Sequence, residues 1–262
     1  MREASERVPK PMVPIGNRPI LWHVMKYFSH FGHKRFVICL GFKGEVIKEF
    51  FLNYSEAMSN DFVLTNGGRN LELLAHDIQD WEITFVNTGL HASIGQRLRT
   101  VRPYLEQEEH FLANYGDVLT DAPLPGLIEN ARQRGAVASF LCVKPNYSFH
   151  LVQTDENDLV EEVKETTHSD LWINGGYFVF RREVFDYIED GEDLVDEPFR
   201  RLSAERLLLA NKYGGFWAAM DTLKDQQQLE QMLEAGNGPW KVWELEPPLG
   251  GTQTSVELQA GS

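Results

Sequence analysis

The chain has 262 residues, a formal net charge of −14 at pH 7 and a hydrophobic fraction of 42%. This composition is ordinary for a globular protein and excludes disorder along the whole chain. The acidic excess and the lack of a Lys and Arg cluster exclude a nucleic-acid partner, because binding to a phosphate backbone needs basic patches. Cys39 and Cys142 lie far apart in short apolar runs, so we predict reduced core cysteines.

The two ends of the chain carry weak structural signals. Residues 1–12 contain no apolar stretch of the kind found in a secretory signal, and no segment approaches the roughly 18 apolar residues of a membrane span. These observations predict a cytoplasmic protein without a membrane partner. Residues 245–262 carry Pro, Gly and Ser without apolar periodicity, so we expect a domain over residues 1–244 followed by a disordered tail.

Helical and strand patterns alternate along the first half of the chain. Apolar residues at helical spacing predict helices, and short apolar runs predict strands. The expected helices cover residues 19–31, 45–54, 97–105 and 124–135, and the expected strands cover residues 34–42, 80–89, 109–117 and 136–144. This alternation predicts an α/β fold with a mostly parallel sheet and helices on both faces.

The pattern changes after about Asn146. Short strands joined by turns are predicted over residues 149–155, 157–165 and 172–182, which is typical of a smaller mixed α+β region. The remaining predicted elements are helices over residues 183–190, 199–211 and 223–236 and an apolar strand or turn over residues 214–221.

Two aspartates follow apolar runs, where an α/β sheet places its ligands. Asp117 ends the segment NYGD, in which Gly116 lets the backbone come close to a ligand. A carboxylate there suits Mg²⁺, although a turn or helix-cap aspartate explains the pattern equally well. Asp221 ends AAMD before a predicted helix, so a helix cap is the simpler interpretation. The two carboxylates could nevertheless converge on one cation.

Other polar residues are candidates for contacts with an anion or a sugar. Lys10 lies between two prolines that hold the backbone extended, which suits a lysine aimed at a phosphate, but local sequence alone favours a solvated lysine. Arg97 opens a predicted helix and could face an anion, although an exposed helix arginine is the more common case. Asn174, Gly175 and Gly176 could form a turn that contacts a sugar, but asparagine followed by glycine is first of all a turn signal. His23 is interpreted as a packed histidine, because no acid lies near it in the sequence.

Taken in order, several segments together resemble the glucose-1-phosphate cytidylyltransferases of the sugar nucleotidyltransferase family. The resemblance runs from about Val8 to Glu244. Its segments are PKPMVPIGNRPILWHVMKYFSHFGHKRFVICLGFKG, NTG, GQRLRTV, NYGD, WINGGYFVF, GFWAAMDTLKD and PWKVW. The resemblance implies a Rossmann-like α/β sheet with a smaller mixed region on the sugar side.

The resemblance also implies a reaction and roles for the candidate residues. A sugar 1-phosphate oxygen would attack the α-phosphorus of CTP in line and release pyrophosphate, with Mg²⁺ as the cofactor. Asp117 and Asp221 would hold Mg²⁺, and Lys10 would reach the phosphate under attack. The substrates would be contacted by Arg97 at the nucleotide, by Gly116 through close backbone approach, and by Asn174 and Gly175 at the sugar.

The chain departs from the family pattern in two places. Members carry a first strand and a glycine-rich loop before PKP, whereas this chain begins MREASERVPKP, so we expect both to be missing. Before the sugar pocket, EEVKETTHSD stands where many members have Glu, Lys and Pro, and Lys164 is the candidate replacement for that lysine. A non-catalytic nucleotide-sugar binding or regulatory protein is therefore the alternative function. The sequence leaves a homo-oligomer open.

Overall fold

The computed structural model describes residues 8–145, 150–166 and 170–244. The tail expected over residues 245–262 and the segment before Val8 lie outside these described ranges. No helix within the described ranges is both long and apolar enough to cross a bilayer. The thiols of Cys39 and Cys142 are free, as predicted, with Cys142 buried and Cys39 half-buried.

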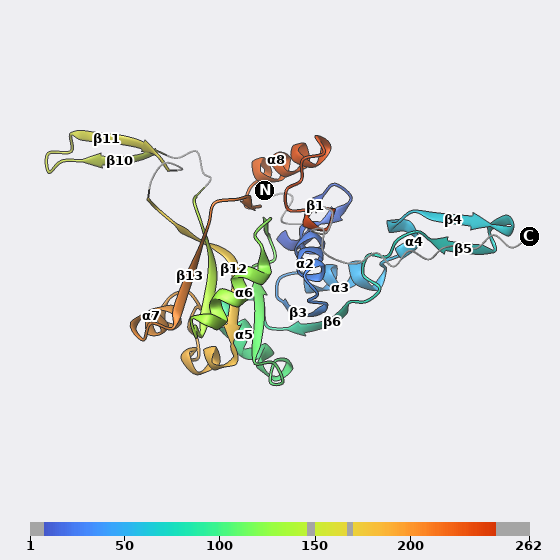
Figure 1. Cartoon of the computed structure of the whole chain (residues 1–262), viewed down its shortest axis with the longest axis horizontal. Coiled ribbons are helices and arrows are strands. Elements are labelled where there is room, and N and C mark those ends of the chain that lie inside the picture. Colours follow the sequence, from blue (N-terminus) through green and yellow to red (C-terminus); the bar gives the residue numbers. More distant parts are fainter. Residues whose placement is uncertain (1–7, 146–149, 167–169, 245–262) are drawn as a thin grey trace, which may run out of the picture.

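A four-stranded mixed sheet forms the centre of the molecule (Figure 1). Its strand order is β13 (Leu208–Tyr213), β9 (Ala138–Val143), β12 (Ile173–Arg181) and β7 (His110–Asn114). The β13 and β9 strands are parallel, and β12 runs antiparallel to both of its neighbours. Side chains alternate between the two faces of a strand, so each of these strands contributes to two cores.

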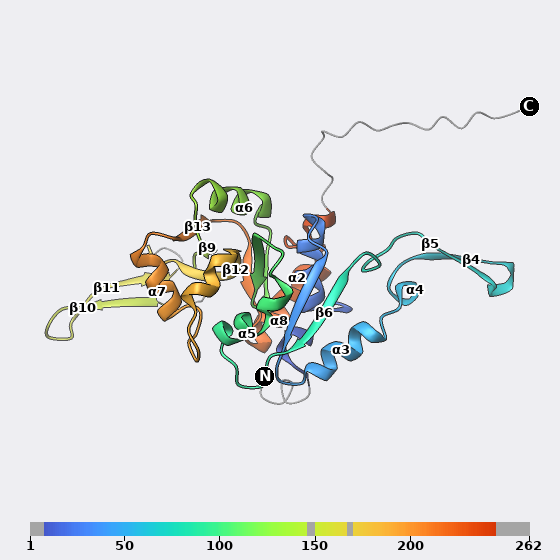
Figure 2. The same cartoon turned by 90° about the horizontal axis from the view of Figure 1, so that it is seen from below.

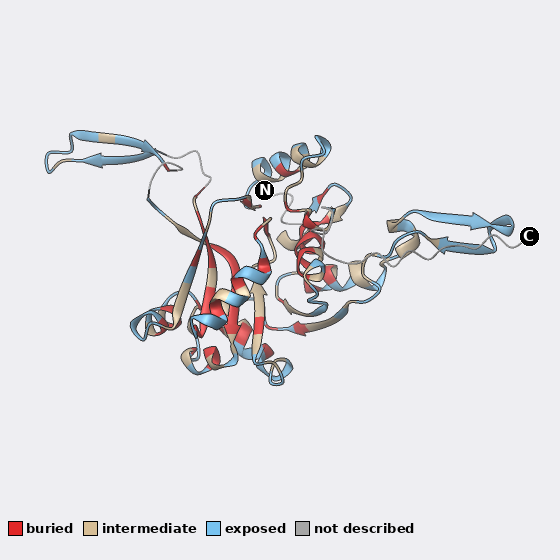
Figure 3. Ribbon diagram, viewed as in Figure 1, coloured by how far each residue is buried: buried red, intermediate tan, exposed pale blue. Residues whose placement is uncertain are grey.

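Helices pack on both faces of this sheet and complete the two cores. One core combines Leu141 and Val179 of the sheet with α2 (Ile20–His30), α6 (Leu124–Gln133) and α8 (Leu223–Glu234). The other core combines Phe178 and Phe180 of the sheet with α5 (Ile94–Val101), the 3₁₀ helix η5 (Arg182–Tyr187) and α7 (Glu197–Ala204). These layers confirm the α/β class expected from the sequence (Figure 3). The central sheet is mixed and not mostly parallel as predicted, because β12 runs antiparallel to both of its neighbours.

A second sheet contains only two parallel strands, β3 (Arg35–Leu40) and β6 (Glu82–Asn87). Helix α3 (Gly44–Leu52) follows β3, and Leu40 and Ile47 lie in a third apolar core with Leu21 and Met25. Arg35 at the start of β3 donates a hydrogen bond of 2.6 Å to Glu108, just before β7. Within the described ranges β3 pairs only with β6 and β7 only with β12, so no strand pairing joins the two sheets.

Two antiparallel hairpins project from opposite ends of the molecule (Figures 1 and 2). One consists of β4 (Phe62–Thr65) and β5 (Asn70–Leu73), with the 3₁₀ turn η2 (Asn66–Gly68) at its tip and α4 (Glu56–Ser59) at its base. The other consists of β10 (His150–Thr154) and β11 (Val160–Glu165). The second hairpin was predicted from the sequence, whereas the first was not.

The remaining short elements surround the central sheet. They are η1 (Lys10–Met12), β1 (Pro14–Ile15), β2 (Arg18–Pro19), η3 (Arg102–Tyr104), β8 (Val118–Thr120), β14 (Trp217–Ala219) and η6 (Val242–Glu244). The β8 and β14 strands pair antiparallel, with Val118 opposite Ala219.

The helix predicted over residues 199–211 is wrong in its second half. Helix α7 ends at Ala204, and Arg206 has a left-handed φ of 60°, which helical residues do not adopt. The following apolar run becomes β13 because it pairs along its whole length with β9, from Leu208 opposite Ala138 to Tyr213 opposite Val143. Pairing with a distant strand therefore overrides the local helical pattern.

Candidate active site

Three residues far apart in sequence form a compact charged cluster. The Lys10 ammonium lies between the carboxylates of Asp117 and Asp221 and forms an ion pair with each. The Lys10 Nζ to Asp117 Oδ2 distance is 2.7 Å. The Asp117 side chain is 18% exposed and that of Asp221 45% exposed, so the cluster is open on the Asp221 side. One cation faces two anions, and the cluster therefore carries a net negative charge.

Strand pairing brings the two aspartates together. Asp117 stands between β7 and β8, after Gly116, whose φ of 86° is a left-handed conformation that favours glycine. Because β14 runs antiparallel to β8, the chain leaving β14 passes beside Asp117, and Met220 donates a backbone hydrogen bond of 3.0 Å to the Asp117 carbonyl. The carboxylates of residues 117 and 221 thus meet at the shared end of this strand pair.

Asp221 is not the N-cap of α8, so the helix-cap interpretation of this residue is wrong. Thr222 is the N-cap of α8 and accepts a hydrogen bond from the Asp225 amide, while the Asp225 side chain accepts from the Thr222 amide. This capping box satisfies the first amides of the helix without the Asp221 side chain. The Asp221 carboxylate is left to face Lys10.

Lys10 is not a solvated lysine. Pro9 has φ −65° and ψ 146°, and η1 begins immediately after it, so the chain turns at this point. Burial lowers the pKa of Lys10, but its contacts with Asp117 and Asp221 outweigh that effect and raise the pKa above its ordinary value. Lys10 therefore stays protonated at neutral pH.

The Asp117 carboxylate has an unfavourable environment for its negative charge. Burial is the main cause that raises the pKa of Asp117, Lys10 partly opposes it, and the neighbouring Asp221 carboxylate raises the pKa further. A divalent cation beside both carboxylates would reverse this balance.

The donor set fits Mg²⁺ that is shared with a substrate. Mg²⁺ in such sites takes one or two carboxylates, keeps several waters and uses substrate phosphates for the remaining positions. Asp117 and Asp221 supply two hard oxygen donors of this kind. Within residues 8–145, 150–166 and 170–244, no group of three or more His, Cys, Asp or Glu side chains could hold a metal by itself.

Asn174 is connected to the NYGD segment through Tyr115. The Asn174 amide donates a hydrogen bond of 2.8 Å to the Tyr115 hydroxyl, two residues before Asp117. A Cβ atom on Gly175 would approach Trp217 Nε1 to 3.1 Å and the Leu141 carbonyl oxygen to 3.2 Å, so the site is closely packed. Tyr115 is a residue that the sequence analysis missed, although it belongs to the NYGD motif.

Arg97 lies over the carboxyl ends of β3 and β6. Helix α5 begins at Ile94 behind an N-cap at Ser93, and the Arg97 guanidinium donates a hydrogen bond of 2.6 Å to Thr88 Oγ1. A Cβ atom on Gly41 would come within 2.7 Å of Arg97 Nη2, so the guanidinium covers that turn. Arg97 thus sits where an α/β sheet presents ligands.

Lys164 is not brought to the cluster. It lies on β11 in a projecting hairpin, where its ammonium pairs with Glu162 at 2.6 Å and its side chain is 53% exposed (Figure 1). His23, in contrast, is a packed histidine as predicted. Its Nε2 lies 3.1 Å from the Ile15 carbonyl, its Nδ1 accepts from Trp240, and burial lowers its pKa to about 4.

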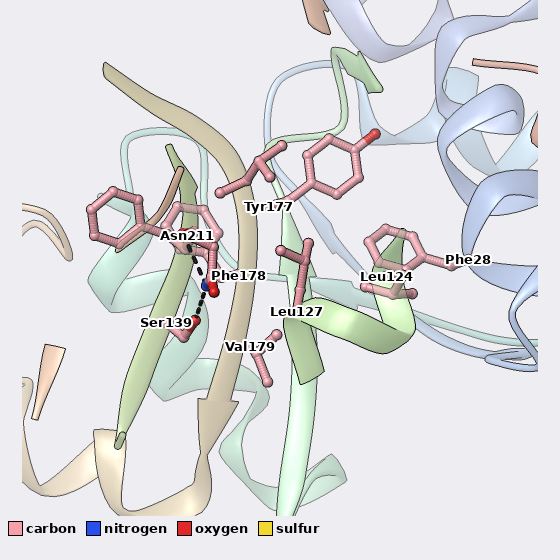
Figure 4. Close-up of a pocket in the computed structure, with 10 residues that line it drawn as sticks. Phe28, Leu124, Leu127, Ser139, Tyr177, Phe178, Val179 and Asn211 are labelled. Carbon is pink, nitrogen blue, oxygen red and sulfur yellow. Dashed lines mark hydrogen bonds between the residues drawn. The ribbon is translucent and has the colours of Figure 1, made fainter. Parts of the chain in front are cut away.

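A narrow pocket lies between α6 and the central sheet (Figure 4). Most of its lining is apolar, and its polar members Ser139 and Asn211 are hydrogen-bonded to each other. None of the predicted site residues lines this pocket, so we interpret it as a feature of core packing.

Comparisons with known proteins show the family of this chain. Residues 1–217 match the family model described as nucleotidyl transferase. The chain is 37% identical over 237 residues to a glucose-1-phosphate cytidylyltransferase of Salmonella typhi, covering 90% of this chain and 92% of that protein. It is 36% identical over 245 residues to a probable glucose-1-phosphate cytidylyltransferase of Bacillus subtilis, covering 93% and 95% of the two chains.

Solved structures share the fold at lower identity. A putative glucose-1-phosphate thymidylyltransferase of Bacillus anthracis, solved with sucrose, superposes with a TM-score of 0.62 and 13% identity, covering 96% of this chain and 92% of that one. The HddC protein of Yersinia pseudotuberculosis gives a TM-score of 0.59 and 15% identity, covering 86% and 90%.

Proposed function

We infer, because this chain belongs to the nucleotidyl transferase family, that it is a sugar-1-phosphate nucleotidyltransferase that makes CDP-glucose from CTP and glucose 1-phosphate. The observation that supports this proposal best is the position of Lys10 between Asp117 and Asp221. A transfer of a nucleotidyl group needs charge stabilisation around phosphates rather than a covalent nucleophile, and this cluster supplies both a cation and carboxylates.

In the proposed reaction an oxygen of the sugar phosphate attacks the α-phosphorus of CTP. The new oxygen to phosphorus bond forms as the bond to the β-phosphate oxygen breaks, and pyrophosphate leaves. Lys10, which stays protonated, would contact the phosphate under attack and stabilise the charge that develops on it. Asn174 and Gly175 would line the sugar pocket, Gly116 would allow close backbone approach, and Arg97 would contact the nucleotide.

We assign the metal-binding role to Asp117 and Asp221. Bound Mg²⁺ would neutralise phosphate charge and orient the reacting groups. Their carboxylates are the hard oxygen donors that Mg²⁺ takes, and both lie against the Lys10 ammonium. A cytoplasmic location belongs to the same proposal, and the free thiols of Cys39 and Cys142 are in keeping with a reducing compartment.

The test is pyrophosphate release by the purified chain with glucose 1-phosphate, Mg²⁺ and each of CTP, UTP, dTTP and GTP in turn. We expect release with CTP above the other three and no release when EDTA removes the metal. The product should be isolated and identified as CDP-glucose by mass spectrometry.

Two outcomes would change the proposal. If another nucleotide is preferred, the chain is still a nucleotidyltransferase, and that nucleotide replaces CTP as the proposed substrate. No release with any nucleotide, from a folded sample that still binds CDP-glucose in calorimetry, would favour the non-catalytic nucleotide-sugar binding protein.

A further inference from the structure

Asn114 ends β7 three residues before Asp117, and its side chain shapes the turn between them. The Asn114 Oδ1 accepts a hydrogen bond of 2.6 Å from the Gly116 amide, which is the bond of an Asx turn. Gly116 has a left-handed φ of 86°. A Cβ atom there would lie 3.8 Å from Pro11 Cγ, an ordinary contact, so the backbone conformation and not crowding favours glycine. The direction in which the chain enters Asp117 thus depends on the Asn114 side chain.

A second turn of the same kind lies beside the first, on the paired strand β12. The Asn174 Oδ1 accepts a hydrogen bond of 2.9 Å from the Gly176 amide, and Gly176 has a left-handed φ of 74°. The strand register places Asn114 opposite Tyr177, and the Tyr115 amide donates to the Gly176 carbonyl at 3.3 Å. A Cβ atom on Gly176 would come within 2.7 Å of the Tyr115 ring, so that ring lies directly against Gly176. The two turns therefore support each other.

The chain that leaves Asp117 is also held in place. The Tyr177 hydroxyl, on a residue that is buried, donates a hydrogen bond of 2.8 Å to the Val118 carbonyl. The Met220 amide donates to the carbonyl of Asp117 itself. The bond between Asn114 and Gly116 completes this set on the side from which the chain arrives. Fixing the backbone on both sides of Asp117 limits the directions that its carboxylate can take.

The amide nitrogen of Asn114 does not help to stabilise the fold. Asn114 Nδ2 is buried and has no hydrogen-bond partner in the part of the chain that the structure describes. A buried donor without an acceptor is destabilising. Replacing Asn114 by alanine therefore removes one hydrogen bond and one unpaired donor, and the two changes act on stability in opposite directions. The geometry that Asn114 gives to the turn can thus be separated from its effect on stability.

We propose that Asn114 is a positioning residue for the reaction, which holds the Gly116 amide and so aims the Asp117 carboxylate at Lys10 and at the metal. The inference rests on the metal-binding role proposed for Asp117. The Asp117 carboxylate lies 2.7 Å from the Lys10 ammonium, so a small change in its direction alters the whole cluster. Removal of a group that orients a metal ligand typically lowers metal affinity or turnover by about 10-fold to 100-fold.

Binding of Mn²⁺ to the full chain, measured by electron paramagnetic resonance, tests the proposal without turnover. We expect Asn114→Ala to weaken Mn²⁺ binding by about tenfold or more. Asn114→Ser, whose hydroxyl can accept from the same amide, should recover part of the affinity. Asp155→Ala is the matched control and should leave the affinity unchanged, because it removes a turn of the same kind on the projecting β10 and β11 hairpin. In that turn Asp155 Oδ1 accepts from the Asn157 amide at 2.9 Å.

Urea unfolding of the same variants separates positioning from a purely structural role. Asn114→Ala should leave the urea midpoint unchanged or raise it, because the lost hydrogen bond and the removed unpaired donor offset each other. A clear fall in the midpoint that accompanies the loss of Mn²⁺ affinity would show a structural residue and overturn the proposal. Unchanged Mn²⁺ affinity in Asn114→Ala, or no Mn²⁺ binding by the wild-type chain, would overturn it as well.

Kinetics distinguish a failure of this inference from a failure of the proposed function. If the wild-type chain releases pyrophosphate, Asn114→Ala should raise the Mg²⁺ concentration for half-maximal rate by about tenfold, with the KM for glucose 1-phosphate changed by less than about twofold. An equal rise in both would contradict a role that acts through Asp117. If the wild-type chain binds Mn²⁺ but releases no pyrophosphate, the proposed function fails, and the Mn²⁺ affinities of the variants decide the role of Asn114.

Discussion

Two clusters of charged side chains in this molecule have opposite compositions. In the active-site cluster one cation, Lys10, faces two carboxylates, Asp117 and Asp221. In the cluster at the base of the β4 and β5 hairpin one carboxylate, Asp77, faces two cations, Arg18 and Lys26. Both clusters join segments that are distant in sequence, but only the first has an excess of negative charge.

The pKa directions follow from this difference. Burial is the main cause that raises the pKa of Asp117, and Lys10 offsets it only in part. Burial also raises the pKa of Asp77, but hydrogen bonds from Tyr54 and Arg18 and the charge of Lys26 outweigh it and lower the pKa. The Asp77 cluster thus stabilises the charge of its carboxylate, whereas the surroundings of Asp117 disfavour its negative charge.

The largest expected effect is the loss of turnover when an active-site carboxylate is removed. Asp117→Asn and Asp221→Asn should each lower Mg²⁺-dependent pyrophosphate release by about 100-fold or more, because both act through the metal. Circular dichroism should show an intact fold. Asp190→Asn, at an exposed position, is the control and should keep wild-type activity. Full activity in either active-site variant would remove that aspartate from the site.

The next effect tests the cation of the same cluster. Lys10→Ala should lower kcat by about 100-fold, since the loss of one charged donor to a developing oxyanion costs that order of magnitude. Lys10→Arg keeps the charge but changes its geometry and should recover only part of the rate. Initial-rate kinetics with saturating CTP measure both. A wild-type kcat for the alanine variant would contradict the assignment.

Breaking the Asp77 cluster should affect stability and leave the chemistry intact. Asp77→Asn leaves Arg18 and Lys26 without their carboxylate and should lower the free energy of unfolding by about 2 kcal/mol, less than for a fully buried pair. Urea unfolding measures this loss. Asp80→Asn, which breaks an exposed pair with Lys34, is the matched control and should change the free energy by less than about 0.5 kcal/mol.

The two aspartates should also have opposite effects on stability as the pH changes. The folded pKa of Asp117 lies above its ordinary value of 3.8, so its charge opposes folding at neutral pH, and Asp117→Asn should raise the urea midpoint at pH 7. Acidification through the raised pKa should close the gap between variant and wild type. The stabilisation from Asp77 is fully present above about pH 3.8 and is lost as the pH falls through its lowered folded pKa. A destabilised Asp117→Asn at pH 7 would contradict this sign.

The smallest expected effect concerns Lys164. Its ammonium pairs with Glu162 on a projecting hairpin, and exposed ion pairs contribute little to stability. Lys164→Ala should therefore change kcat and the KM for glucose 1-phosphate by no more than about twofold. A tenfold rise in KM alone would return Lys164 to the sugar-phosphate role that the family pattern suggested.

Sequence patterns predicted most elements of the fold, and the site residues stay predictions. Local sequence predicts helix α2, strands β3 and β6 and the aspartate that follows β7. It does so because periodicity and turn residues act over a few neighbouring positions. The pattern over residues 199–211 was misleading, because a short apolar run fits a helix or a buried strand equally well. Only pairing with β9 made its second half a strand.

What the sequence determined by itself is the family, the α/β alternation of elements and the chemical type of each candidate residue, since these depend on local pattern and on motifs in order. The tertiary structure decided which of those residues meet. The antiparallel pairing of β8 with β14 places Asp221 beside Asp117 and Lys10, while Arg97 contacts Thr88 and Lys164 pairs with Glu162. Convergence of this kind depends on contacts between segments more than 100 residues apart, as between positions 117 and 221, and no local spacing encodes them.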